Sequence, residues 1–214
     1  VFPCLTRTTP YRPAEVVRMA AMLYPVGTAT NASGHLEIGG CDVVELAAEY
    51  GTPAYVFAVA EMRARARAYT EAFSAHTDNF EVLFASRALP VTAAYRLFAE
   101  EGLSVDVASG GELTMALAAG YSPERIYMHG NNKTDAELEL AASAGVGHLI
   151  LDSFDEIERC ERVLTRQQDV LIRGTPGIKP STHSYIQTGQ MDSKFGFGLE
   201  NGSAAKAIER VLAP

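Results

Sequence analysis

Five apolar stretches decide the fold class: residues 81–86 (EVLFAS), 103–109 (LSVDVAS), 125–130 (RIYMHG), 148–153 (HLILDS) and 169–174 (DVLIRG). Their first residues lie 22, 22, 23 and 21 positions apart, and an amphipathic helical pattern fills each gap. Strands that alternate with helices at this spacing predict βα units and a parallel sheet. We therefore expect an α/β fold, either a doubly wound sheet or part of a (β/α)8 barrel.

The helix starts in this region share one pattern, a hydroxyl residue three positions before a glutamate. It occurs at Ser109–Glu112, Thr134–Glu137 and Ser153–Glu156, and it predicts a capping box at each helix. The start at Ser109 could instead bind an anion. No GxGxxG follows the first strand, which disfavours a dinucleotide-binding sheet. A complete barrel needs eight units and about 250 residues, so we expect an incomplete barrel of about five units.

The residues before the first unit are less regular. We divide the chain into a lead-in, a strand and helix segment, and the barrel, with boundaries at 1–34, 35–60 and 61–214. The proline-rich lead-in is expected to be irregular, with at most a short helix at 14–23. Short strands are expected at 35–38 and 53–57, and helices at 42–50 and 61–76.

Composition excludes several classes of protein. The 214 residues include 18 basic and 26 acidic side chains, for a net charge of −8, which argues against a nucleic-acid or anionic-membrane surface. No apolar run approaches a membrane span, and no secretory signal is evident. Cys4, Cys41 and Cys160 form neither a disulfide framework nor a metal site. We expect a cytoplasmic protein without a metal.

Polar residues gather where the predicted strands end, which is where parallel βα folds place their sites. Alternation along the strands puts Arg87, Asp106 and Arg173 on faces that point into one space. Charged residues there are costly unless they are paired, and such groups often mark a site. A structural ion pair between Asp106 and Arg173 is the alternative. The segment 129–133 (HGNNK) is equally readable as a turn or as part of the site.

Several motifs carry a family resemblance. They are Gly39–Val43, Tyr50–Val56, Phe84–Ala88, Val105–Glu112, His129–Lys133, Thr182–Gly189 and Asp192–Phe197. In this order they resemble the diaminopimelate decarboxylase family, within the alanine-racemase-like, fold type III pyridoxal-phosphate enzymes. The resemblance covers roughly residues 35–200 and matches the N-terminal portion of such a protein.

The resemblance implies a (β/α)8 barrel, a β domain to which the N-terminal segment would belong, and a homodimer. It implies removal of a carboxylate from meso-diaminopimelate to give L-lysine and CO2, with pyridoxal 5′-phosphate as the electron sink. By the same resemblance the catalytic positions are Arg87, Asp106 and Glu112. The cofactor-binding positions are Ala85, Arg87, Asp106, His129 and Arg173.

Two departures from the family pattern stand out. Arg87 occupies the position of the lysine that holds the cofactor as an imine, and a guanidinium stays protonated to about pH 12 and is a poor nucleophile. The later family motifs are also missing, and the chain begins with Val1, so we expect a fragment whose sheet edges make it prone to aggregate. The alternatives are an inactive pseudoenzyme with a binding or regulatory role, or a sequence error at position 87.

Overall fold

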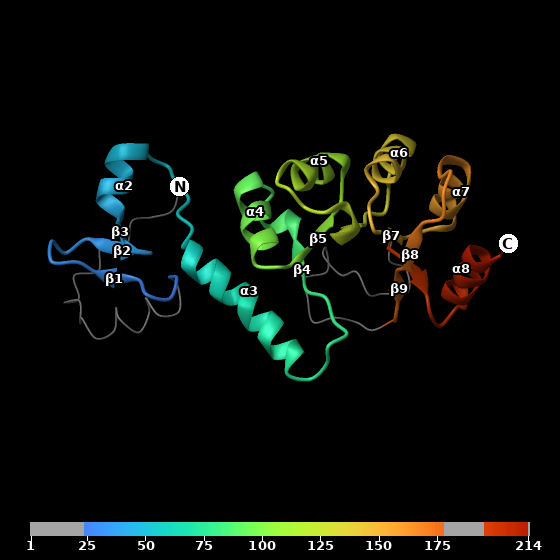
Figure 1. The fold of residues 1–214 in the computed structure, drawn as a ribbon, viewed down its shortest axis with the longest axis horizontal. Coiled ribbons are helices and arrows are strands. Elements are labelled where there is room, and N and C mark those ends of the chain that lie inside the picture. Colours follow the sequence, from blue (N-terminus) through green and yellow to red (C-terminus); the bar gives the residue numbers. More distant parts are fainter. Residues whose placement is uncertain (1–23, 178–194, 214) are drawn as a thin grey trace, which may run out of the picture. The chain divides into compact units, whose positions relative to one another are not determined.

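The computed structural model describes residues 24–177 and 195–213. The chain divides into two compact units, residues 1–68 and 69–214 (Figure 1). The expected helix at 14–23 and the motif at 182–189 lie outside the described residues.

The N-terminal unit contains a small antiparallel sheet in the order β1–β2–β3, formed by Ala29–Thr30, Leu36–Ile38 and Cys41–Asp42. Helix α2 (Val43–Tyr50) follows directly, and the Asp42 carboxylate caps it by accepting from the Val44 amide at 2.8 Å. The division between the units falls within α3 (Val59–Ser74).

Two expectations about this unit were wrong. The lead-in is not irregular throughout, because β1 pairs with β2 around a turn in which the Asn31 side chain accepts from the His35 amide at 3.0 Å. Residues 53–57 do not form a strand. None of the sheets among the described residues includes this segment, and Tyr55 is 94% exposed.

The C-terminal unit is built on a five-stranded parallel sheet in the order β4–β5–β6–β7–β8. The strands are Leu83–Ala85, Ser104–Val107, Ile126–Met128, His148–Leu151 and Asp169–Ile172, each within one of the five predicted stretches. The helices that connect them are α4 (Thr92–Glu100), α5 (Gly110–Ala118), α6 (Asp135–Ala144) and α7 (Phe154–Val163). A 3-10 turn, η1 (Ser86–Ala88), follows β4, and a second one, η2 (Pro123–Arg125), precedes β6.

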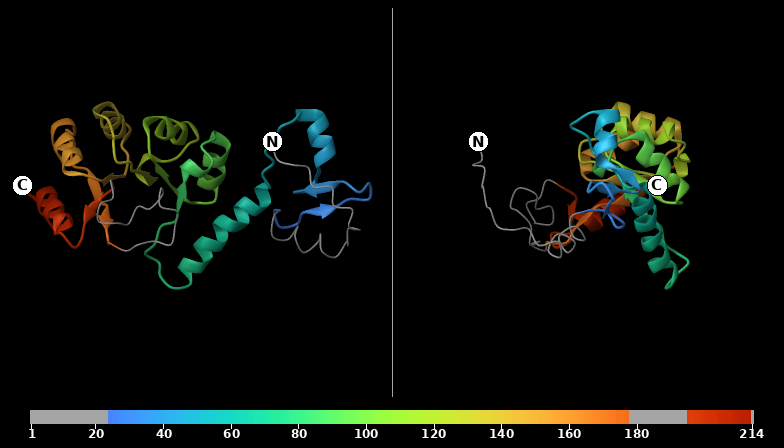
Figure 2. Two further views of the ribbon diagram at one scale, coloured as in Figure 1. Left: turned by 180° about the vertical axis from the view of Figure 1, so that it is seen from behind. Right: turned by 90° about the vertical axis from the view of Figure 1, so that its left-hand side faces the viewer.

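Helices α4 to α7 lie along one face of this sheet, as the left view in Figure 2 shows. The core forms between the two layers, where Val105, Val107 and Met128 are fully buried against α5 and α6 residues such as Leu113 and Leu138. Burying each such side chain contributes about 1.5–3 kcal/mol. The predicted alternation in β5 is therefore confirmed, because its valines face the helices and Asp106 faces the other way.

The chain then adds a second, two-stranded parallel sheet. β9 (Gly174–Thr175) continues from β8 and pairs with β10 (Phe197–Gly198), which leads into α8 (Ser203–Leu212). Within the five-stranded sheet β4 and β8 are the edge strands. The arrangement is α/β, as predicted, with five successive βα units of the kind that build a (β/α)8 barrel.

The helix caps differ from one another in a way the sequence pattern does not reveal. Thr134 and Glu137 form the full reciprocal capping box. At α5 and α7 the serine hydroxyl accepts from the glutamate amide, but the glutamate carboxylate reaches one residue further back, to the amides of Ala108 and Asp152. Glu112 and Glu156 therefore tie each helix to the end of the strand before it.

Candidate cofactor site at the strand ends

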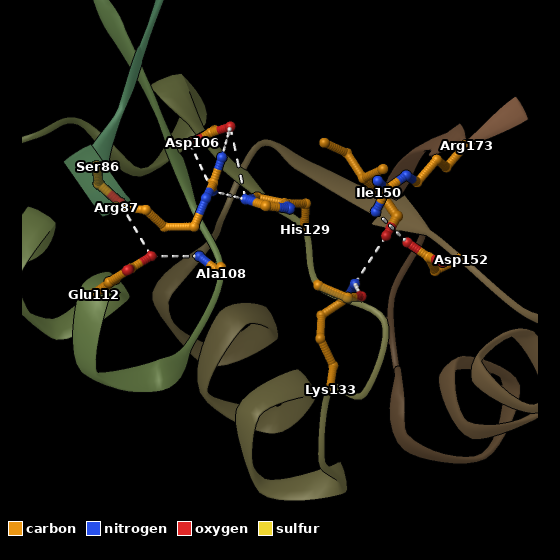
Figure 3. Close-up of polar contacts among 11 residues, drawn as sticks. Ser86, Arg87, Asp106, Ala108, Glu112, His129, Lys133, Ile150, Asp152 and Arg173 are labelled. Atoms are coloured by element: carbon orange, nitrogen blue, oxygen red, sulfur yellow. Dashed lines mark hydrogen bonds and ion pairs between the residues drawn. The ribbon is translucent and has the colours of Figure 1, made fainter. Parts of the chain in front are cut away.

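The ends of β4, β5 and β6 bring three predicted site residues together (Figure 3). Arg87 lies in η1, Asp106 in β5, and His129 directly after β6. The Arg87 guanidinium donates to both Asp106 carboxylate oxygens, at 3.2 and 3.4 Å, and contacts His129 Nε2. His129 Nε2 is also 3.6 Å from the Asp106 carboxylate. Of the two arginines expected to share this space with Asp106, Arg87 is the one that pairs with it.

The protonation of His129 follows from its surroundings. Burial lowers its pKa, as do the nearby Arg87, Lys133 and Arg173 cations, whereas Asp106 raises it without reversing the net shift. The lowered pKa favours the neutral imidazole, and in that form Nε2 can accept from the Arg87 guanidinium, which only donates. The site therefore combines a cation, an anion and a neutral imidazole.

Ala85 and Glu112 border this cluster without joining it. Asp106 is paired in register with Ala85 of β4 on one side and with Tyr127 of β6 on the other, so β4 places only a methyl group beside it. The Glu112 carboxylate accepts from the Ser86 hydroxyl at 3.0 Å and from the Ala108 amide at 2.6 Å. Glu112 thus fastens η1 to the end of β5, immediately behind Arg87.

The alternative pairing of Arg173 with Asp106 is wrong. Arg173 donates to the Asp152 carboxylate at 2.9 Å and lies over the Phe195 ring, 4.5 Å from its centroid. The Asp152 side chain is 1% exposed, and it also accepts from the Gly196 amide at 2.6 Å. Asp152 is nearer because β7 is the direct neighbour of β8, whereas β5 lies two strands further away.

Lys133 is the residue that sequence reasoning missed. It ends the segment 129–133, yet its side chain is 1% exposed and lies 2.5 Å from the Glu156 carboxylate. It also donates to the backbone oxygens of Gly130 and Ile150, both at 2.8 Å. A lysine in a polar, turn-forming segment gives no signal of burial, so only the structure could identify it.

The family follows from comparison with known proteins. Residues 59–213 match the family described as "Pyridoxal-dependent decarboxylase, pyridoxal binding domain". The chain belongs to this family. Curated relatives named diaminopimelate decarboxylase are 47% identical over 188 residues in Bacillus methanolicus and 49% identical over 185 residues in Bacillus subtilis. These matches cover 86% and 85% of this chain but only 44% and 42% of the relatives, so the chain spans less than half their length.

Solved structures agree with this assignment. The diaminopimelate decarboxylase of M. jannaschii, in co-complex with L-lysine, is 32% identical with a TM-score of 0.77, covering 86% of this chain and 44% of that one. The Helicobacter pylori enzyme complexed with L-lysine is 30% identical with a TM-score of 0.69, covering 79% and 42%. The five βα units described above are thus those of a pyridoxal-phosphate-dependent decarboxylase barrel.

The described residues do not fit covalent attachment of the family's cofactor, which requires a lysine amine. Arg87 carries a guanidinium. The lysines among residues 24–177 and 195–213 are Lys133, enclosed by its ion pair with Glu156, and Lys206 on α8. Lys179 and Lys194 lie outside the described residues.

In the described part of the chain, no group of three or more histidine, cysteine or acidic side chains could hold a metal ion. No helix in this part has the length and apolar character needed to cross a membrane.

Proposed function

We propose that this chain is the pyridoxal-phosphate-binding portion of a diaminopimelate decarboxylase, which converts meso-diaminopimelate to L-lysine and CO2. The observation that carries this proposal is the 47–49% identity to proteins of that name over 85–86% of the chain. The relatives solved with L-lysine support an amino-acid substrate, because L-lysine is the product that remains when diaminopimelate loses one carboxylate.

Several residues of this chain have roles in the proposed function that do not depend on covalent attachment of the cofactor. Arg87 and Asp106 balance each other's charge at the strand ends, and neutral His129 presents an imidazole beside them. Arg173, held by Asp152, places a second cation on the same rim. Such a rim suits a ligand that carries both anionic and cationic groups.

A second candidate function is an inactive decarboxylase-like protein with a binding or regulatory role. Arg87 favours it, because a guanidinium cannot condense with the cofactor aldehyde at neutral pH. The two candidates therefore differ in covalent chemistry, and this can be measured on the purified chain and its Arg87→Lys variant.

The experiment adds pyridoxal phosphate, reduces with borohydride and locates the label by peptide mass mapping. Labelling of one lysine in the unaltered chain, together with CO2 release from diaminopimelate, supports the enzyme and refutes the inactive candidate. Labelling at position 87 only in Arg87→Lys supports the inactive candidate. Lys206, exposed on α8, reports non-specific labelling. If position 87 in Arg87→Lys labels no faster than Lys206, this rim is not a pyridoxal-phosphate site.

We further propose, from the resemblance alone, that the complete protein is a cytoplasmic homodimer. The test is light scattering on a longer protein, in which this chain is extended by the residues that its relatives have in addition. The measured mass should be that of a dimer. A monomer would contradict this.

A further inference from the structure

Lys133 and Glu156 form a buried ion pair behind the strand ends. Their side chains are 1% and 5% exposed, and the pair is 2.5 Å long. The Lys133 ammonium donates hydrogen bonds to the Gly130 and Ile150 backbone oxygens, and its ion pair with Glu156 balances its charge. A buried charge is costly unless it is paired and hydrogen-bonded. The ammonium is therefore fixed in one place.

Glu156 extends the connection to α7 and the end of β7. Its second carboxylate oxygen accepts from the Asp152 amide at 2.8 Å. Burial raises the pKa of Glu156, although Lys133 and the Asp152 amide act in the opposite direction. The pair thus joins the loop after β6, the end of β7 and the first turn of α7.

These segments carry the outer site residues. Gly130 directly follows His129, and Asp152 holds both Arg173 and the Gly196 amide. Figure 3 shows Lys133 pointing to Ile150 between the His129 loop and the Asp152–Arg173 pair. The ammonium itself does not reach the group formed by Arg87, Asp106 and His129.

Helix capping alone does not explain the lysine. At α5, Glu112 makes the same contact to the amide four residues before it, and its further partner is the neutral Ser86 hydroxyl. The same cap therefore forms without a buried cation. What Lys133 adds at α7 is the attachment of two backbone oxygens from different strand ends.

We propose that Lys133 and Glu156 are positioning residues, which hold the His129 loop and the Asp152–Arg173 pair in fixed relative places at the candidate site. The inference rests on the proposed function only in treating these strand ends as a cofactor site. Its test uses no cofactor, so its failure is distinguishable from failure of that proposal.

The test compares three variants of the whole chain. Lys133→Met removes the cation, and Lys133→Met/Glu156→Leu removes both charges. Arg162→Met is the control, because it breaks an ion pair between α6 and α7 that lies at the surface, 2.8 Å from Asp135. Urea unfolding gives stability, and NMR amide exchange at Gly196 and His129 reports the position of the two segments.

Lys133→Met is expected to be strongly destabilised, because Glu156 then carries an unpaired buried charge. The double variant is expected to recover most of that stability. The double variant nevertheless loses the hydrogen bond from the Asp152 amide to Glu156, and Asp152 is the residue that holds the Gly196 amide. The Gly196 amide is therefore expected to exchange about tenfold faster than in the parent, which is the effect of losing one hydrogen bond. Arg162→Met is expected to leave both amides unchanged.

Three results would overturn the proposal. Parental exchange at Gly196 and His129 in the double variant would show that the pair contributes stability alone. Equal acceleration in Arg162→Met would show a non-specific effect. Failure of the double variant to fold would place the pair in the fold itself, not in the site.

Discussion

Glu112→Ala tests whether the carboxylate behind Arg87 stabilises the strand ends. Glu112 accepts two hydrogen bonds, from the buried Ser86 hydroxyl at 3.0 Å and from the Ala108 amide at 2.6 Å. Each bond to a charged group is worth about 1.5–3 kcal/mol, and the alanine leaves Ser86 without this acceptor. We expect a loss of about 3 kcal/mol, which raises the unfolding equilibrium constant by about two orders of magnitude.

The assay is urea unfolding followed by circular dichroism, with the slope against denaturant checked for constancy. Glu161→Ala is the matched control, since Glu161 also makes two short contacts, both 2.7 Å to Arg210, but the pair is about half exposed. Exposed ion pairs contribute little, so the control should be nearly neutral. If Glu161→Ala costs as much as Glu112→Ala, burial does not determine the strength of these contacts and the reasoning fails.

Further predictions concern a glycine, a carboxylate and a thiol. Gly196→Ala should cost about 3 kcal/mol in urea unfolding, because φ is +72° and a Cβ would lie 2.6 Å from a backbone oxygen. Gly202→Ala, with φ of +75° and open space, should cost clearly less. Desolvation raises the pKa of Asp42, but its hydrogen bonds have a larger, opposite effect, and the net pKa is about 2. The N-terminal unit should therefore lose stability as pH falls from about 4 towards 2, and Asp42→Asn should remove this dependence. Burial raises the pKa of Cys160 to about 11, so a thiol reagent should modify exposed Cys41 faster than Cys160. Equal rates at the two thiols would contradict this.

The sequence was sufficient to predict the parallel sheet and the cluster of polar residues at its strand ends. The strand spacing and the alternation in β5 are local patterns, and the pairing of Arg87 with Asp106 follows because β4 and β5 are neighbours in both sequence and space. Strand β1 was missed because a two-residue strand is too short to give a periodicity.

Other contacts could not be predicted because they depend on distances across the fold. The Gly196 amide meets the Asp152 carboxylate 44 residues away, and no local pattern links them. Lys133 belongs to a polar segment whose composition favours exposure, and its burial depends on Glu156 from the next helix. The partners of Arg173 and Lys133 thus became evident only when the neighbouring strands were placed side by side.

The two faces of the five-stranded sheet have separate consequences for sequence change. Val105 and Val107 pack against the helices, whereas Asp106 between them points the other way, towards Arg87. A substitution on the polar face therefore changes the chemistry while leaving the interlocked apolar layer intact. Arg87 illustrates this independence, because its guanidinium contacts Asp106 and His129 and does not belong to the buried apolar cluster.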